Sequence, residues 1–533
     1  MSEGKEVGRR LKEQHPEQQA QFPQSWVVVP LAEVATLNPT RQAIDLPLST
    51  PLPFVAMSSV GAEFGGISIS TERPLHEVSK GYTQFCSGDV LMAKITPCME
   101  NGKLAVVPEL SAPVGYGSTE FHVLRATEAT EPRWIAHFVS QSTFRRDAKR
   151  NMSGSAGQLR VPGRWLDDQM FPLAPKHEQQ RILAKLDELF SDLDAGVAAL
   201  LRARANLKRY RAAVLKAAVE GRLTLEWRAK HPPTETGAEL LARLLRERRL
   251  RWEHAQLAKF EASGKTPPKD WRSKYVEPAA PDTTTLPALP DGWCWANLEQ
   301  LVERSEYGSS VKCSYDGKHQ PVLRIPNIAK GELDLSDIKF ATIDLGDNTD
   351  DYALAGDMLV CRTNGSIRLL GKCAVVKAAP LLPHHFASYL LRFRLTEREC
   401  LPAWVHLFLS SIPGRRFIEH NAASSAGQHN ISLSTLHQMP IPLPPVSEAE
   451  MAFQQSTQTL SAIDRQERDI ERALKRAASL RQSILKRAFS GKLVPQDPTD
   501  EPASVLLERI RAARTKATAS RPKAAQGKRA SGI

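Results

Sequence analysis

The chain has 533 residues and a mass of 59.0 kDa, with 41% hydrophobic and 24% charged residues. This composition is typical of a globular protein with room for several domains, and it excludes a small disulfide-stabilised scaffold. Lys and Arg outnumber Asp and Glu by 71 to 59, which gives a net charge of +12 and makes a polyanion the first partner to consider.

Seven cysteines are scattered along the chain without a CxxC pair, which argues against a structural zinc site and indicates a reducing compartment. Residues 1–22 are polar and predict a disordered N-terminal tail. No run of about eighteen apolar residues occurs, so we expect neither a signal peptide nor a membrane span. These features predict a cytoplasmic protein without membrane contact.

After the tail, the sequence repeats itself at a nearly constant spacing. Gly88-Asp-Val-Leu-Met-Ala-Lys94 matches Gly356-Asp-Met-Leu-Val-Cys-Arg362, and Ser155-Ala-Gly-Gln158 matches Ser425-Ala-Gly-Gln428. The matches are offset by 267 to 270 residues, a drift too small for coincidence. The sequence therefore predicts two copies of one unit with pseudo-two-fold symmetry.

Each copy begins with a segment of mixed character, residues 23–176 and 290–446. Short β-branched runs alternate there with Gly, Pro and Asn turn signals, and one helical stretch lies near Trp134 or Trp404. We expect each segment to fold as a compact α+β domain.

A long helix is predicted after each domain, at residues 177–221 and 447–491, because both segments are rich in good helix formers. Acidic starts and basic ends favour antiparallel pairing into a stiff coiled-coil rod about 65 Å long. The alternative is an amphipathic helix lying on a globular core. The predicted seam residues are Ile182, Leu186, Leu189, Leu193, Leu200, Ala203, Leu207, Tyr210 and Val214 in the first helix, and Ile463, Ile470, Ala477 and Ile484 in the second.

Connectors and a second tail complete the chain. Residues 222–261 predict a helical connector, and residues 492–514 a related C-terminal helical segment. The Pro-rich residues 262–289 predict an extended and mobile linker, and residues 515–533 a disordered basic tail. The predicted fold class is thus α+β, with two similar domains separated by two long antiparallel coiled-coil helices.

Motifs for nucleotide chemistry are missing from the sequence. No Gly-x-Gly-x-x-Gly follows a predicted strand, and no Gly-x-x-x-x-Gly-Lys-Ser/Thr occurs, so neither a dinucleotide nor a nucleoside triphosphate has a recognisable cradle. Asp89 and Asp357 recur in both copies before an apolar strand. A turn closing onto that strand is the favoured interpretation, and an acidic nuclease cluster is the alternative.

The repeated Gly-Asp-x-Leu-x-x-Lys/Arg segment, the string Lys94-Ile-Thr-Pro-Cys-Met-Glu-Asn-Gly-Lys103, the Ser-Ala-Gly-Gln turns and the Pro-Leu-x-Pro runs before the long helices resemble the specificity subunit of type I restriction-modification enzymes. The resemblance covers nearly the whole chain. It implies two target-recognition domains that each read one half of a bipartite, asymmetric DNA site. It also implies that the paired helices set the spacing between the halves and dock the methyltransferase subunits.

The residues that would contact DNA are predicted from base-edge chemistry, since Arg or Lys suits guanine and Asn or Gln suits adenine. The alternatives are that the two Asn-Gly pairs only make turns, that the glutamines only cap the next segment, and that the paired arginines are solvated surface rather than phosphate contacts. The DNA-binding candidates are Lys94, Thr96, Asn101, Lys103, Arg145, Arg146 and Gln158 in the first domain, and Arg362, Asn364, Ser366, Arg368, Lys372, Arg415, Arg416 and Gln428 in the second.

The resemblance implies that the chain has no catalytic residue, metal or cofactor of its own. Its expected partners are double-stranded DNA, two modification subunits that use S-adenosylmethionine, and restriction subunits that use ATP and Mg²⁺. Two other hypotheses stay open: an autonomous DNA-modifying or DNA-cleaving enzyme with an unrecognised site, and a coiled-coil scaffold without a DNA role.

Overall fold

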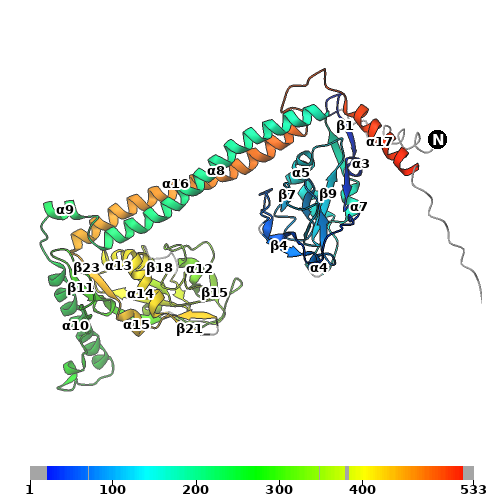
Figure 1. Ribbon diagram of the computed structural model, residues 1–533. Coiled ribbons are helices and arrows are strands. Elements are labelled where there is room, and N and C mark those ends of the chain that lie inside the picture. The colour runs from blue at the N-terminus through cyan, green and yellow to red at the C-terminus, as the bar shows by residue number, and fades with distance from the viewer. Residues whose placement is uncertain are drawn as a thin grey trace, which may run out of the picture. The chain divides into compact units, whose positions relative to one another are not determined.

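The computed structural model describes residues 21–69, 71–155, 157–346, 348–377, 383–425 and 427–519 (Figure 1). The predicted tails, residues 1–22 and 515–533, lie mostly outside these ranges. Internal contacts divide the chain into two compact units, which are residues 1–200 with 471–533 (unit 1) and residues 201–470 (unit 2). Each long helix therefore contributes one end to each unit.

Unit 1 contains a two-stranded sheet and two four-stranded sheets in its described part. The small sheet pairs β1 (Val27–Pro30) with β10 (Met170–Leu173). The inner sheet has the order β2 (Ala35–Leu37), β9 (Phe121–Ala126), β6 (Val90–Ala93), β7 (Leu104–Val106), and the outer sheet has the order β4 (Thr71–Pro74), β3 (Pro51–Val55), β8 (Gly115–Gly117), β5 (Thr83–Phe85). The helices around them are α3 (Leu31–Val34), α4 (Leu75–Val78), α5 (Pro132–Ser140), α6 (Ser142–Arg150) and α7 (Gly163–Asp167).

The core of unit 1 lies between the inner sheet, α5 and segments from both ends of the chain. Trp134 of α5 is fully buried and donates its indole N–H to the carbonyl of Pro172 at 3.2 Å. Phe489, just beyond α16 (Val446–Ala488), stacks on Trp134 with ring centroids 3.9 Å apart. Beyond it, α17 (Ala503–Ala519) begins where the Ala503 amide donates to the carbonyl of Ser25. Residues near 500 thus complete the N-terminal domain.

Unit 2 repeats this plan. Its small sheet pairs β11 (Cys294–Asn297) with β23 (Pro440–Leu443). The inner sheet has the order β12 (Val302–Tyr307), β20 (Leu390–Leu395), β16 (Met358–Cys361), β18 (Cys373–Val375), and the outer sheet has the order β13 (Cys313–Ser314), β15 (Lys339–Ala341), β14 (Pro321–Leu323), β19 (His385–Phe386). A third sheet joins β17 (Thr363–Asn364), β22 (Gln428–Asn430) and β21 (Ala423–Ser425). The helices around these sheets are α11 (Leu298–Leu301), α12 (Ile325–Ile328), α13 (Leu401–Ser410), α14 (Ile412–Asn421) and α15 (Leu433–His437), and α9 (Leu225–Lys230) and a longer helix, α10 (Gly237–Ala262), precede them in the chain.

Two buried tryptophans in each unit make the same hydrogen bonds. The indole N–H of Trp404 donates to the carbonyl of Pro442, as Trp134 does to Pro172. Trp26 donates to Glu178 at 2.9 Å, and Trp293 donates to Glu448 at 2.8 Å. Each glutamate lies in the first turn of a long helix, so the tryptophan fastens that helix to its domain.

The repeated Gly-Asp motif is structural. Asp89 accepts the amide of Cys86 and binds the Arg125 guanidinium through two hydrogen bonds of 2.8 and 2.7 Å. Asp357 binds Arg394 in the same way, at 2.8 Å for both bonds. Both aspartates are buried in the inner sheets. The turn interpretation is therefore confirmed, and these carboxylates serve as cross-strand ties.

The two long helices, α8 (Lys176–Val219) and α16, pair antiparallel as predicted. Asp194 of α8 meets Arg481 of α16 in unit 1. In unit 2, Arg211 of α8 meets Asp464 of α16. The two ion pairs are equally far apart along both helices, so the register is constant between them.

The predicted seam of α8 is partly wrong. Tyr210 is 54% exposed, and Ala203 is exposed too. In the neighbouring heptad column, Phe190 is buried and Arg211 is bonded to the partner helix, while Arg204 between them is exposed. Both columns offer apolar residues, so apolar spacing alone does not distinguish them.

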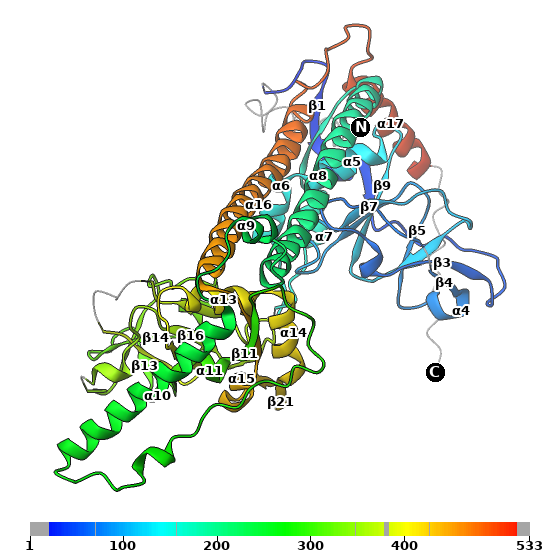
Figure 2. The same ribbon diagram turned by 90° about the vertical axis from the view of Figure 1, so that its left-hand side faces the viewer.

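The Pro-rich segment is irregular, and single residues of it are anchored on the rest of unit 2, while its predicted mobility stays a prediction. The preceding α10 (Gly237–Ala262) lies beside α11 and β11, as Figure 2 shows. Trp271 is buried and stacks on Trp252 of α10 with centroids 5.9 Å apart. The Tyr275 hydroxyl accepts a hydrogen bond from Arg248, also of α10. These aromatic side chains hold the segment against the helix.

One core residue of unit 1 is unusually polar. His137 of α5 is buried between Phe64 and Phe190, and neither ring nitrogen has a hydrogen-bond partner among the described residues. Burial lowers the pKa of His137 to about 3. The equivalent position in unit 2 is Leu407, which is also buried.

We expect His137→Leu to stabilise unit 1 by about 1–3 kcal/mol near pH 7, because it removes an unsatisfied buried polar group. Unfolded His137 takes up a proton as the pH falls below about 6.5, whereas the folded side chain does not until about pH 3. As the pH falls between these values, this residue should lower the free energy of unfolding of the wild-type unit by up to about 1.4 kcal/mol for each pH unit. Hydrogen exchange of the α5 amides measures this, and equal pH slopes in variant and wild type would contradict it.

Candidate nucleic-acid interface

Two loops meet at one place in each unit. The long loop comprises residues 94–103 or 362–372, and the short loop comprises residues 153–160 or 423–430. In unit 1, the Thr96 hydroxyl donates to the carbonyl of Gly157 at 2.9 Å, and the Thr96 amide donates to Leu159. In unit 2, Thr363 and Asn364 pair with the short loop as strands β17 and β22. The predicted residues Thr96, Thr363 and Asn364 are thereby brought against the short loops that carry Gln158 and Gln428.

The backbone that joins these loops is the same in both units. The amide of Lys94 donates to the carbonyl of Glu120, and the carbonyl of Lys94 accepts from Val161, both at 2.9 Å. The amide of Arg362 donates to Tyr389, and its carbonyl accepts from Ile431, again both at 2.9 Å. Equivalent side chains therefore start from equivalent backbone positions.

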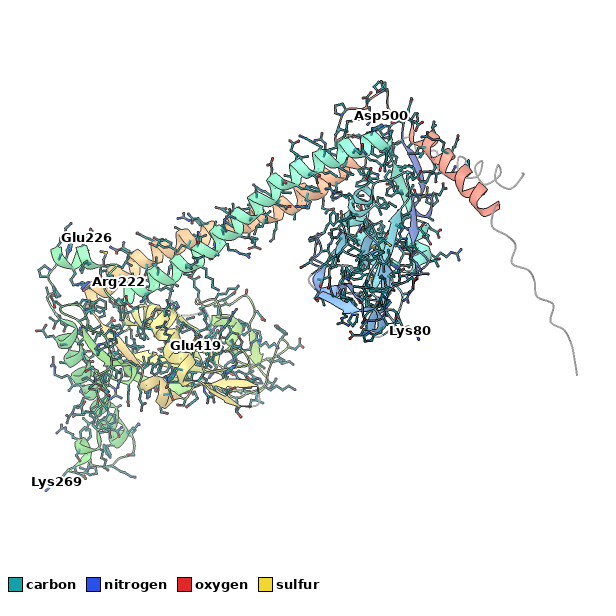
Figure 3. The ribbon with its side chains drawn as sticks, viewed as in Figure 1. Lys80, Arg222, Glu226, Lys269, Glu419 and Asp500 are labelled. Atoms are coloured by element: carbon teal, nitrogen blue, oxygen red, sulfur yellow. The ribbon has the colours of Figure 1, made fainter. Side chains whose placement is uncertain are left out.

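The first arginine of each predicted pair holds the long loop. Arg145 of α6 binds Glu63 through two hydrogen bonds of 2.8 Å and donates to the carbonyl of Glu100, and its side chain is only 15% exposed. Arg415 of α14 donates to the carbonyls of Leu370 and Ile367. Arg415 also pairs with Glu419, which Figure 3 labels on α14.

The second arginine of each pair points outward. Arg146 is 61% exposed, with its nearest carboxylate in the adjacent Asp147 at 3.9 Å. Arg416 is exposed at the equivalent position of α14. The predicted arginine pairs therefore divide into an inner loop-holding member and an outer solvated member.

The other predicted residues of the long loops have mixed surroundings. Lys103 donates to the carbonyl of Met57 at 2.8 Å, and Lys372 is half-buried. The Asn364 side chain accepts the amide of Ser366, which closes the turn that the alternative interpretation anticipated. Asn101, at the turn before Gly102, and Arg368 are exposed.

The glutamines of the short loops are exposed at the junction with the long loops. The carbonyl of Gln158 accepts a hydrogen bond from Arg160. The amide nitrogen of Gln428 lies 3.8 Å from where a Cβ on Gly365 would stand. Both glutamine side chains are thus available at the loop surface.

Sequence reasoning missed an ion pair beside Lys94. The guanidinium of Arg160 binds Glu120 through its Nε at 2.9 Å and its Nη2 at 2.8 Å. This hydrogen bonding lowers the pKa of the Glu120 carboxyl and raises that of Arg160. The repeated Ser-Ala-Gly-Gln turn aligns Arg160 with Asn430, whereas Glu120 is matched to Tyr389 only by the backbone hydrogen bonds from Lys94 and Arg362.

The same place in unit 2 carries aromatic and amide groups. The Arg362 guanidinium lies over the ring of Tyr307, 4.9 Å from its centroid. Tyr307 and Tyr389 are both exposed. The Asn430 side chain accepts a hydrogen bond from the Thr363 hydroxyl at 3.0 Å. The two domains therefore share the backbone hydrogen bonds that join the loops and differ in the side chains exposed beside them.

Within the described ranges, no group of three or more His, Cys, Asp or Glu side chains is arranged to hold a metal ion. In that same part of the chain, no helix combines the length and apolar character needed to cross a bilayer.

No protein-family model matches the chain. The EcoKI specificity subunit of a type I restriction enzyme from Escherichia coli K12 is 26% identical over 511 residues, covering 92% of this chain and 96% of that protein. The EcoEI specificity subunit from Escherichia coli is also 26% identical, covering 82% and 79%. A solved chain from work on complex assembly and conformational transition of the type I R-M system matches 89% of this chain and 99% of its own length, at 20% identity and a TM-score of 0.58.

These features define a duplicated α+β protein in which two related domains are attached to one antiparallel helix pair. The match to the solved chain confirms this fold. The sequence similarity along nearly the whole chain is with one group of proteins. Along most of its length the chain is similar to specificity subunits of type I restriction enzymes.

Proposed function

We propose that this chain is the non-catalytic DNA-reading subunit of a type I restriction-modification complex. Each domain reads one half of a bipartite, asymmetric site through its long and short loops, and the paired helices set the distance between the halves. The observation that carries this proposal is that one backbone frame occurs twice, with different side chains at the loop surface. Two domains with the same backbone arrangement and different side chains at the loop surface are suited to binding two different half-sites.

The candidate residues divide into three roles under this proposal. Lys94, Thr96, Gln158, Arg362, Asn364 and Gln428 lie where the loops meet and read base edges, with support from Asn101, Lys103, Ser366, Arg368 and Lys372. The exposed Arg146 and Arg416 bind phosphates, which contributes affinity without sequence information. Arg145 and Arg415 position the long loops from within.

The partners follow from the same proposal. Two modification subunits bring S-adenosylmethionine, restriction subunits bring ATP and Mg²⁺, and the cytoplasm is the place of action. Tyr210 and Leu480 occupy equivalent positions on the two long helices and are 54% and 51% exposed. Matching exposed apolar side chains on equivalent surfaces support docking of two copies of one partner.

Methylation mapping tests the proposal. We expect host cells that express the chain with its modification subunits to methylate adenines in one asymmetric, two-part motif. The purified chain alone should transfer no methyl group, and DNA binding by the assembled complex should weaken steeply as salt rises. Turnover by the chain alone would favour an autonomous enzyme, and a complex that binds no DNA would favour a scaffold.

A further inference from the structure

The two domains carry different side chains at a place where their backbone hydrogen bonds are the same. Position 120 aligns with 389 and position 160 with 430, and both lie beside the backbone bonds shared by Lys94 and Arg362. Unit 1 has a glutamate and an arginine there, whereas unit 2 has a tyrosine and an asparagine. Since the frame is unchanged, the difference lies in what the surface offers to a ligand.

The Arg160 guanidinium is held in one orientation. Its Nε and Nη2 donate side-on to the two Glu120 oxygens, and one N–H of its Nη1 donates to the carbonyl of Gln158 at 3.2 Å. An arginine has five N–H donors in a planar fork. One N–H of Nη1 and one of Nη2 remain, and neither has a hydrogen-bond partner within the described ranges.

Both partners are in part accessible to a ligand, since the Arg160 side chain is 40% exposed and the Glu120 side chain 25%. Two parallel N–H donors match the O6 and N7 acceptors of guanine in the major groove, which is the commonest specific arginine contact. A surface ion pair of this kind contributes little to stability, so folding alone gives weak reason for it.

We propose that Arg160 reads a guanine in the half-site of the first domain, with Glu120 as the positioning residue that presents its outer edge. This inference rests on the proposed function and specifies one base of the first half-site. At the equivalent place in the second domain, the amide of Asn430 favours a different base, since Asn pairs with the N6 and N7 edge of adenine. The two half-sites therefore differ at the matching position.

The test uses the complete complex with its modification subunits and a set of duplexes in which each base pair of the motif is replaced in turn. We expect Arg160→Gln and Arg160→Lys to reduce discrimination at one G·C pair of one half-site by about ten- to a hundred-fold, because neither side chain offers the fork. Glu120→Gln should relax the same position in part, and Glu120→Asp, which keeps the carboxylate, should restore most of it. The matched control Asn430→Ala should affect only the other half-site.

The outcomes separate the two proposals. If the wild-type complex has no two-part motif, the proposed function fails. If the motif is present and both Arg160 variants keep the wild-type base preference at every position, the inference is wrong and the proposed function stands. Thermal unfolding checks each variant, and Arg160→Lys, which keeps the charge beside Glu120, decides the matter if Arg160→Gln is unstable.

Discussion

Exchanging the first domain for that of a relative is expected to change one half of the recognised site and leave the other half intact. Each mismatched base pair costs about 1–3 kcal/mol, so an altered half-site of a few base pairs should lose methylation by a hundred-fold or more. The reason is that the loops predicted to read DNA are held by hydrogen bonds within their own domain, such as the bond from the Lys94 amide to the Glu120 carbonyl. Methylome mapping of the chimaera measures the result.

The structure shows where the junctions of such a chimaera belong. Trp26 bonds to Glu178 of α8, and Trp134 stacks on Phe489, so these contacts with the helix ends must be kept. Exchanging residues 38–162 while retaining Trp134 and Phe138 preserves them. A matched exchange in unit 2, retaining Trp404 and Phe408, should change the opposite half. A change in both halves from either exchange would show that the domains do not read independently.

Lengthening the helix pair is expected to move the two half-sites apart. Seven residues inserted into α8 and seven into α16, both midway between the Asp194–Arg481 and Arg211–Asp464 ion pairs, add one heptad to each helix and keep both pairs. The added length is about 10 Å, or about three base pairs at 3.4 Å each. The preferred spacer should grow accordingly.

Insertion into one helix alone is the informative control. It shifts one of the two ion pairs by a heptad relative to its partner, so we expect weak pairing and loss of methylation rather than a new spacer. Selection of the spacer from a library of duplexes measures both variants. An unchanged spacer in the doubly lengthened protein would refute the idea that the helices set the distance.

The duplicated organisation could be predicted from the sequence because the repeat preserves spacing as well as residues. The Gly-Asp motif and the helix ends recur at nearly one offset, and the structure gives them the same roles, as with Asp89 and Asp357. The antiparallel pairing followed from charge order, since acidic starts meet basic ends in Asp194–Arg481 and Arg211–Asp464.

Features that depend on distant contacts were beyond sequence patterns. The seam column containing Phe190 and Arg211 differs by one residue from the column containing Leu189 and Tyr210, and only the partner helix distinguishes them. The Pro-rich segment looked unattached because its anchor, Trp271, packs on a residue of another element.

The candidate site was predicted in part for the same reason. Lys94, Thr96 and Gln158 were nominated from local chemistry, and the structure brings them together. The ion pair of Glu120 and Arg160 escaped notice because it joins residues 40 positions apart through the sheet. Only the folded backbone, which carries both residues next to Lys94, brings the pair together.

The division of the chain also bears on its synthesis. The core of unit 1 includes Leu485, Phe489 and Leu507, whereas unit 2 is continuous from residue 201 to 470. On the ribosome, the domain whose strands emerge first can therefore complete its core only after residues 485–507 have been synthesised. We expect a product truncated before residue 485 to leave the apolar core of unit 1 incomplete and to be degraded faster than the full chain.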